Sequence, residues 1–310
     1  MTFDNRPART RKLMRPPRLK TGDTIGIAAP AGPFATDLFE RGMVVLKDIG
    51  FKVHIPEAVF QREGFLAGPD EARADVINTL FADPAINGIF CARGGYGSTR
   101  VLPHLDWKAI RRHPKVFVGF SDITVLHCLF LARAGLVTFH GPMGTTLATA
   151  TEDSLSVLQQ ALMTDTPVDL MPSDAAVLNH GQASGNVMGG NLTLLCHLAG
   201  TPYQPSFDGC LLFVEDITEA PYRIDRMLVQ MTLAGCFEGL AGLILGQFTD
   251  CGNTEEIHDV FMRTFGPLGI PVVAGFPIGH GEENVTLPIG MEARLTTRPP
   301  RLTYLQAATI

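Results

Sequence analysis

Short apolar segments alternate with amphipathic ones through the first half of the chain, and this alternation constrains the fold more than any other feature. It predicts buried strands at residues 23–30, 51–55, 86–91, 116–120 and 136–139, with helices at 38–46, 70–82, 109–113 and 123–134 between them. Strands and helices that alternate at this spacing form βαβ units and a parallel sheet. Continuous apolar strands indicate a sheet covered on both faces.

The pattern changes beyond residue 144. Residues 144–180 form a less patterned connector with one predicted helix at 152–163. Helices at 192–198 and 222–234 and strands at 210–214, 242–246 and 271–275 follow, with a predicted β-hairpin at 285–296 around Ile289-Gly290. We predict an α/β protein with a disordered basic tail (1–20), a first domain (21–145), a linker (146–180) and a second domain (181–310).

Composition supports a folded protein with about two domains. Of the 310 residues, 45% are hydrophobic and 18% are charged, which argues against disorder for the bulk of the chain. No segment approaches the length of about 18 apolar residues that a membrane-spanning helix needs. No apolar segment follows the basic tail, so we expect no secretory signal and a cytoplasmic location.

Charge is distributed unevenly. The net charge is −6, and the first twenty residues carry seven basic side chains and one acidic one, so residues 21–310 carry −12. An acidic body repels phosphate backbones, and we therefore expect neither nucleic acid nor membrane as a partner of the folded part. The basic tail itself is either a solvated extension, which we favour, or a patch for nucleic acid or membrane.

The six cysteines indicate free buried thiols in a reducing compartment. None belongs to a C-x-x-C pair, and most lie in apolar runs. The nine histidines show no metal-ligand spacing, and no H-E-x-x-H sequence occurs. We expect no metal and no cofactor.

A serine follows the fourth predicted strand, in Gly119-Phe120-Ser121-Asp122. Ligands bind at such carboxyl ends of parallel strands. The strand-to-helix turn is similar in mechanics to a nucleophile elbow, although the sequence is not G-x-S-x-G. The N–H groups at the start of the helix suit a developing oxyanion. The alternative is that Ser121 or Asp122 merely caps the helix.

Two other loops follow predicted strands. Residues 92–100 contain three glycines within four positions, which let the backbone approach a ligand closely. This loop could cradle a phosphate, donate an N–H to an oxyanion, or bind nothing. It lacks the P-loop lysine and the dinucleotide fingerprint, which argues against an oxidoreductase. His140, in His140-Gly141-Pro142, is either catalytic or, as we favour, a residue that hydrogen-bonds the backbone and shapes its loop.

The second half of the chain adds three acidic residues and one histidine. Glu215, Asp216 and Glu219 follow one predicted strand, and His280 lies between glycines after another. Clustered carboxylates bind a cation, orient a histidine, perform acid–base chemistry or simply form a solvated loop. A serine, an acid and a histidine, each at a strand end, would form a hydrolytic triad in the chain order Ser…Glu…His.

Six segments in register resemble the LD-carboxypeptidases, the serine peptidases that trim murein tetrapeptides in the bacterial cytoplasm. They are Cys91–Gly97, Gly119–Asp122, Phe139–Pro142, Gly189–Leu192, Val214–Arg226 and Gly279–Gly281. The match extends from about residue 20 to about residue 300. The resemblance implies a flavodoxin-like or Rossmann-like N-terminal domain, a smaller β-rich C-terminal domain, an active site at their interface, and a homodimer.

The resemblance also implies roles for single residues. Ser121 would be the nucleophile, His280 the general base and acid, and Glu215 the group that orients His280. The substrate would be a small peptide, a murein tetrapeptide that loses its terminal D-alanine from the L-centre of diaminopimelate or lysine.

The implied oxyanion hole consists of the backbone N–H of Asp122 and that of Gly94 or Gly95, with Gly95 slightly favoured. A free carboxylate on the substrate should meet a cation. Arg93, Arg100 and Arg223 are the candidates. Arg223 ranks lower because it is equally placed to hold Glu219 or Asp225.

Two alternatives stay open. Some members of the family are self-immunity peptidases that cleave peptidyl-nucleotide antibiotics of the microcin C type. Those carry aromatic side chains that stack on the base, whereas this chain has one tryptophan, Trp107, in a segment typical of packing. The second alternative is a non-catalytic, flavodoxin-like binding module, which would have no need of His280.

Overall fold

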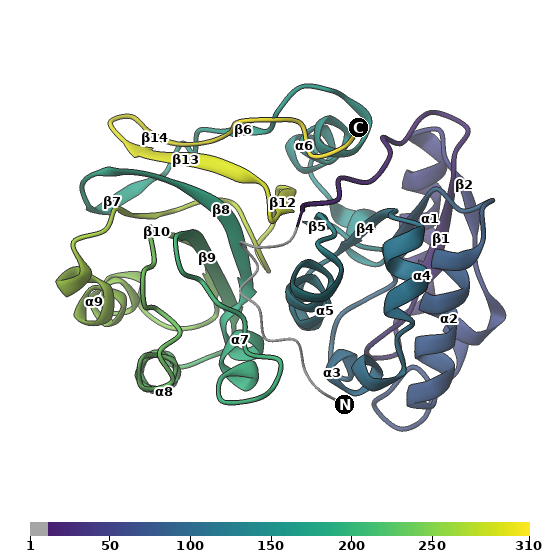
Figure 1. Cartoon of the computed structure of the whole chain (residues 1–310), viewed down its shortest axis with the longest axis horizontal. Coiled ribbons are helices and arrows are strands. Elements are labelled where there is room, and N and C mark those ends of the chain that lie inside the picture. Colours follow the sequence, from purple (N-terminus) through teal and green to yellow (C-terminus); the bar gives the residue numbers. More distant parts are fainter. Residues whose placement is uncertain (1–11) are drawn as a thin grey trace.

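The computed structural model describes residues 12–310, and its strands form two sheets that lie side by side (Figure 1). We use "first lobe" for the first sheet with helices α1 to α5, and "second lobe" for the second sheet with α7 to α9. Helix α5 of the first lobe packs against α7 and β8 of the second lobe. The protein is therefore a mixed α/β protein, as predicted.

The first sheet has the strand order β12-β5-β4-β3-β1-β2. Five of these strands are parallel, and only β12 runs antiparallel to its neighbour β5. Its strands are β1 (Thr24–Ala28), β2 (Lys52–His54), β3 (Gly88–Cys91), β4 (Val116–Gly119), β5 (Thr138–His140) and β12 (Leu287–Ile289). Every residue of β3, β4 and β5 is buried, which fits strands covered on both faces.

Within the described residues, the first lobe has five α-helices, and all of them except the short third one were predicted from the sequence. They are α1 (Thr36–Asp48), α2 (Asp70–Ala82), α3 (Ser98–Val101), α4 (Trp107–Arg112) and α5 (Thr124–Leu129). The single helix predicted at 123–134 consists of three parts, because a 3₁₀ turn precedes α5 and a π-helical turn, Phe130–Ala134, follows it.

The second sheet has the order β6-β14-β13-β8-β9-β10-β11-β7. Its strands are β6 (Asp169–Leu170), β7 (Ala176–Asn179), β8 (Gln182–Asn191), β9 (Cys210–Ile217), β10 (Gly242–Thr249), β11 (Val272–Ala274), β13 (Glu292–Thr297) and β14 (Pro300–Tyr304). The central strands β8, β9, β10 and β11 are parallel, and the outer strands pair antiparallel.

Two of the three helices of the second lobe were predicted from the sequence. These are α7 (Leu192–Leu198) and α8 (Pro221–Leu233). The third, α9 (Thr254–Phe265), was missed, although it has an N-terminal Asn253 cap and buries Ile257, Phe261 and Phe265 along one face. Its apolar residues recur at helical spacing, which is the signal that identifies such a helix.

The hairpin predicted at 285–296 is wrong. Strand β12 pairs with β5 of the first sheet, whereas β13 pairs with β8 and β14 of the second. All of β12 is buried, while β13 alternates between exposed and buried residues. A strand buried on both faces fits beside β5, and an alternating strand fits a sheet with one solvated face.

The predicted linker, residues 146–180, contributes structure to the second lobe. It contains α6 (Glu152–Met163), and strands β6 and β7 form the two edges of the second sheet. Because these strands and β12 come from outside the predicted limits of their lobes, those limits do not coincide with the limits of the sheets.

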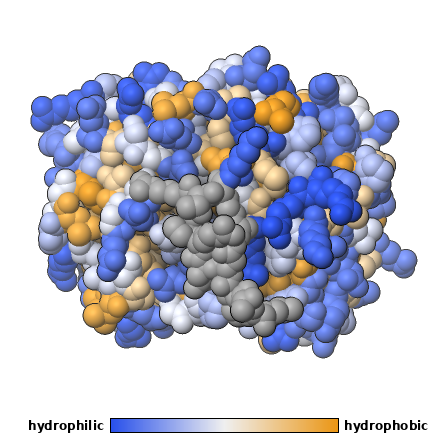
Figure 2. All heavy atoms as spheres, in the orientation of Figure 1, coloured by the Kyte–Doolittle hydropathy of each residue, from blue (hydrophilic) through white to orange (hydrophobic). Residues whose placement is uncertain are grey.

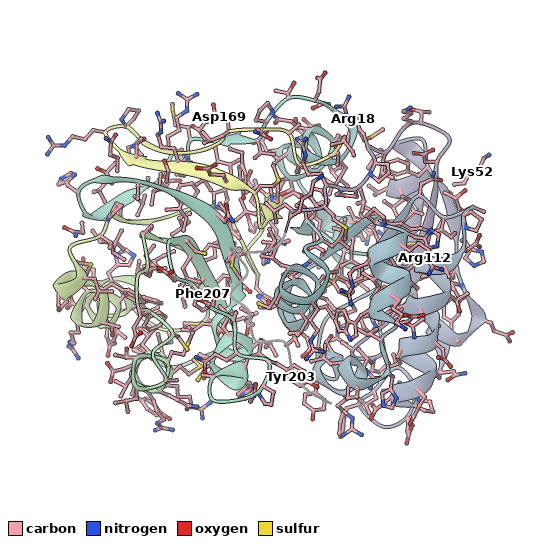
Figure 3. All side chains as sticks on the ribbon, viewed as in Figure 1. Arg18, Lys52, Arg112, Asp169, Tyr203 and Phe207 are labelled. Atoms are coloured by element: carbon pink, nitrogen blue, oxygen red, sulfur yellow. The ribbon has the colours of Figure 1, made fainter. Side chains whose placement is uncertain are left out.

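The prediction of a disordered tail is wrong for residues 12–20, and residues 1–11 lie outside the described residues. The backbone N–H of Met14 donates to the carbonyl of Gly135 (2.8 Å), that of Arg18 to Ile310 (2.8 Å) and that of Leu19 to Leu162 (2.9 Å). Figure 3 places Arg18 beside α6. The segment is held in place because Leu19 is buried and the backbone groups find partners.

The face shown in Figure 2 is mainly hydrophilic, with apolar side chains in small separate groups. Within residues 12–310, no helix has the length and apolar character required to cross a membrane.

Candidate active site

Ser121 lies on a sharp turn between β4 and α5, at the carboxyl edge of the first sheet. Its φ is +64°, in the left-handed region that residues other than glycine seldom adopt. Strained backbone of this kind concentrates at functional sites. Ser121 is the first residue of the 3₁₀ turn Ser121–Ile123, whose N-cap is Phe120, and the N-cap of α5 is Ile123. Neither Ser121 nor Asp122 is therefore the cap of a helix, which argues against the capping alternative.

Ser121, His280 and Glu215 form one chain of hydrogen bonds. The His280 Nε2 lies 3.0 Å from Ser121 Oγ, and His280 Nδ1 lies 2.6 Å from Glu215 Oε2. Because an ionised carboxylate only accepts, the His280 proton belongs on Nδ1. Nε2 is then free to accept the proton of the serine hydroxyl.

Burial and charge together set the ionisation of this pair. Glu215, on β9, is fully buried, and burial raises the pKa of its carboxyl. Burial disfavours the charged form of His280, but the hydrogen bond and negative charge of Glu215, with the charge of Asp216, outweigh it and raise the pKa of His280. The carboxylate therefore stabilises the imidazolium that forms when the histidine takes a proton.

The glycine-rich loop after β3 lies against Ser121. A Cβ placed on Gly94 would come within 2.9 Å of Ser121 Cβ and 3.3 Å of the Asp122 nitrogen, so only glycine fits there. Gly95 has a φ of +109°. The buried carboxylate of Asp122 accepts a hydrogen bond of 2.8 Å from the backbone N–H of Ser98, which ties the loop to the serine turn. Of the predicted oxyanion residues, Gly94 thus lies against Ser121 and Asp122, whereas a Cβ on Gly95 would meet Gly32. The roles of all three in an oxyanion hole stay predictions.

The loop that carries His280 is held by a residue that sequence analysis missed. Asn284 is 7% exposed, and its Oδ1 accepts a hydrogen bond of 3.0 Å from the N–H of Gly279. The N–H of Asn284 donates to the Oγ of Ser154 on α6, also at 3.0 Å. A single asparagine in a loop has no periodic signal, and its contact with a distant helix has no local one, so this pair could not be found from the sequence.

A second missed group joins the two lobes behind the site. The N–H of Asn191 donates to the hydroxyl of Thr124 on α5 (3.0 Å), and its Nδ2 donates to Asp216 (2.9 Å). Asp216 also accepts from the N–H and hydroxyl of Thr193 and from the N–H of Ile217. Asp216, next to Glu215, is therefore a structural acceptor.

The three predicted substrate-binding arginines have protein partners. Arg93 donates to the carbonyl of Pro33 (2.7 Å), and Arg100 forms a two-pronged ion pair with Asp70 (2.9 and 2.8 Å). Arg223 lies 3.7 Å from Glu219, the pairing that had ranked it lower. A cavity of about 150 Å³ lies beside His280, and none of the three arginines lines it. The roles of these arginines in substrate binding stay predictions.

His140 does not belong to the hydrogen-bonded chain. It is fully buried on β5, with its ring 5.7 Å from that of Phe120 and 5.0 Å from that of Phe213. Burial lowers its pKa well below the usual value, which keeps the ring neutral. Among the described residues, neither ring nitrogen of His140 has a hydrogen-bond partner. The predicted hydrogen bond from His140 to the backbone is therefore wrong, and the ring instead packs against two phenylalanines.

The described residues contain no cluster of three or more histidine, cysteine or acidic side chains placed to hold a metal ion. All six cysteines are free and buried, as predicted. Burial raises the pKa of Cys91 well above its usual value and that of Cys128 to about 12, so these thiols stay protonated and unreactive.

A serine–histidine–carboxylate chain at the strand ends of an α/β fold is the arrangement of a serine hydrolase. Residues 25–141 match the N-terminal domain of LD-carboxypeptidases, and residues 184–295 match the C-terminal domain. The chain therefore belongs to the LD-carboxypeptidase family of peptidases.

Known relatives cover nearly the whole chain. A putative carboxypeptidase of Streptomyces coelicolor is 39% identical over 94% of this chain and 96% of its own length. The murein tetrapeptide carboxypeptidase of Pseudomonas aeruginosa is 33% identical over 87% and 92%. The microcin C7 self-immunity protein MccF of Escherichia coli is 30% identical over 88% and 90%.

Solved structures of the same family have the same fold as this chain. An MccF-like protein of Bacillus anthracis superimposes with a TM-score of 0.89 at 26% identity, over 94% of this chain and 99% of the other. A muramoyltetrapeptide carboxypeptidase of Oxalobacter formigenes gives a TM-score of 0.79 at 33% identity, over 91% and 97%.

Proposed function

We propose that this protein is an L,D-carboxypeptidase that removes the terminal D-alanine from murein tetrapeptides by means of a Ser121–His280–Glu215 triad. The hydrogen-bonded chain from Ser121 through His280 to Glu215 carries the proposal. The relatives named murein tetrapeptide or muramoyltetrapeptide carboxypeptidase supply the substrate class.

In the first half of the reaction, Ser121 Oγ attacks the carbonyl carbon that precedes D-alanine, and His280 Nε2 takes the hydroxyl proton. The oxyanion that forms accepts hydrogen bonds from the backbone N–H of Asp122 and of Gly95 or Gly94. His280 then gives its proton to the departing amine. The carbon–nitrogen bond breaks, D-alanine leaves, and an acyl ester remains on Ser121.

In the second half, water replaces the amine. His280 accepts a proton from the water as its oxygen attacks the ester, and it returns that proton to Ser121 Oγ as the ester bond breaks. The tripeptide leaves with a new carboxylate. Glu215 stays ionised throughout and holds the imidazole in the required tautomer. Each step uses groups that are present in the chain.

Cytoplasmic action in peptidoglycan recycling and a homodimeric state complete the proposal, and both rest on the resemblance to the family. Light scattering of the purified protein tests the dimer. Fractionation of cells followed by immunodetection tests the location.

Mass spectrometry of protein incubated with a murein tetrapeptide tests the activity. We expect the wild-type protein to release one alanine and Ser121→Ala to release none. Full activity of Ser121→Ala would overturn the assignment of the nucleophile. Absence of cleavage by the wild-type protein would overturn the proposed substrate.

A second candidate is a self-immunity peptidase that cleaves peptidyl-nucleotide antibiotics of the microcin C type. The similarity to MccF and to the MccF-like structure favours it. Parallel incubation with a peptidyl-adenylate separates the two candidates, because each predicts a different released product. If neither substrate is cleaved, a non-catalytic binding module becomes the leading interpretation.

A further inference from the structure

A cavity of about 150 Å³ lies beside His280. We call it the small cavity. One wall is the loop Gly279–Asn284, which carries His280, and the opposite wall consists of Thr146, Thr149, Ala150 and Ser154 at the start of the predicted linker. Phe120 and Ile217, close in sequence to Ser121 and Glu215, complete it. The cavity therefore adjoins the proposed triad.

The residues that line the small cavity indicate on which side of the scissile bond it lies. In the proposed reaction, His280 delivers a proton to the leaving amine, so the departing residue lies on the His280 side. The acyl carbonyl lies on the side of Asp122 and the Gly94-Gly95 pair. Of these groups only His280 lines the small cavity. The cavity thus faces the leaving group.

The size of the small cavity admits only a small occupant. Pockets for drug-sized ligands measure about 300–1,000 Å³, and the volume of this cavity is about half the lower limit of that range. Phe120, Pro142 and Ile217 offer apolar contacts that suit a methyl group. One alanine fits this description, and a branched or aromatic residue does not.

Hydrogen bonds across the small cavity fix its width. Ser154 on one wall accepts the N–H of Asn284 on the other, and Asn284 in turn accepts from Gly279. The two walls cannot separate to admit a larger residue unless a buried hydrogen bond breaks, which carries a desolvation cost.

We infer that the small cavity is the subsite for the released residue, and that Ala150 and Thr149 restrict that residue to the size of alanine. The inference rests on the proposed function and deepens it, because it assigns the selectivity for the leaving group to the segment between β5 and α6.

The test measures kcat/KM for three murein-type tetrapeptides that end in glycine, D-alanine or D-leucine. For the wild-type protein we expect cleavage of the first two and at least tenfold lower kcat/KM for D-leucine. Ala150→Leu places extra carbon atoms in the small cavity, and we expect it to lose D-alanine cleavage at least tenfold while it retains more of the glycine activity. Thr149→Leu, at an exposed position, should act in the same direction.

Ala148→Leu is the matched control, because Ala148 lies in the same turn but does not line the small cavity. We expect it to leave the order of the three substrates unchanged. Equal cleavage of all three peptides by the wild-type protein, or equal losses on glycine and D-alanine in both Ala150→Leu and Thr149→Leu, would overturn the inference and leave the proposed function intact. If the wild-type protein cleaves none of the three, the proposed function itself fails.

Discussion

The carboxylate of Asp122 and the backbone N–H of Ser98 are joined by a buried hydrogen bond of 2.8 Å that holds the glycine-rich loop against the serine turn. In the mechanism that we propose, the residue after the nucleophile therefore has two uses. Its own N–H donates to the oxyanion, and its side chain positions the loop that supplies the other N–H.

Removal of that carboxylate should misplace the loop without any change to the triad. Because a displacement of about 1 Å costs roughly 10²-fold in rate, we expect Asp122→Ala to lower kcat by about that factor. Asp122→Asn keeps an acceptor for Ser98 and should recover most of the activity. Steady-state kinetics of both variants measure kcat and so test the positioning role of the Asp122 carboxylate. A kcat in Asp122→Ala equal to that of the wild-type protein would refute this role.

Glu215→Gln keeps the shape of the side chain but removes the charge that stabilises protonated His280. We expect kcat to fall by roughly 10³- to 10⁴-fold, as is typical when the carboxylate of such a triad becomes an amide. Residues that act as one unit lose activity non-additively. The double variant with Ser121→Ala should therefore be no less active than Ser121→Ala alone. If the double variant instead loses activity by the product of the two single losses, Ser121 and Glu215 do not act as one unit.

The pH dependence of kcat/KM should report the ionisation of His280. Burial opposes the charged ring, but Glu215 and Asp216 raise its pKa above the usual value. Only the neutral ring accepts the serine proton, so activity should rise with pH through a midpoint above about 6.5. In Glu215→Gln the main raising cause is lost, and the midpoint of the residual activity should move to lower pH. An unchanged midpoint would show that a group other than His280 controls the rise of activity with pH.

Gly94→Ala should impair catalysis because the new Cβ would lie 2.9 Å from Ser121 Cβ and 3.1 Å from its Oγ. We expect at least a tenfold loss of kcat/KM, since the nucleophile and the loop must move apart. The control is Gly266→Ala, where the new Cβ meets only the end of Met262 at 3.4 Å. Full activity in Gly94→Ala would place this loop farther from the reaction than we propose.

Asp216→Ala should destabilise the protein. The carboxylate is 2% exposed and accepts hydrogen bonds from Asn191, Thr193 and Ile217. Its removal leaves buried donors without a partner, at a cost of about 3 kcal/mol in the free energy of unfolding. Urea denaturation measures this loss. Asp48→Ala, at an exposed position of α1, should change the value by less than about 0.5 kcal/mol.

The five parallel strands of the first sheet were predictable from the sequence, and so were the three residues of the hydrogen-bonded chain, because both have local signals. Five apolar strands alternate with helices in the first lobe. Ser121 follows β4, His280 lies in the loop after β11, and Glu215 lies near the carboxyl end of β9, which extends beyond its predicted limit of residue 214. Parallel strands bring their carboxyl ends to one edge, so distant residues become neighbours without any knowledge of the loops between them.

Pairing between distant segments was not predictable in the same way. Nothing local indicates that Leu287–Ile289 joins β5 in place of its neighbour β13. Likewise, Arg100 was a candidate for the substrate carboxylate, yet Asp70, thirty positions earlier, holds it. The burial of Leu19 outweighed the basic composition around it, which composition alone could not reveal.

The position of β12 has a consequence for the order of events during synthesis. A chain that emerges from the ribosome N-terminus first exposes the unpaired edge of β5 until residues 287–289 have also been made. His280 emerges only shortly before them. A nascent or prematurely terminated chain that lacks residues 280–289 therefore has neither a complete first sheet nor the base that we propose for Ser121. The proposed hydrolysis can begin only after both segments have been made.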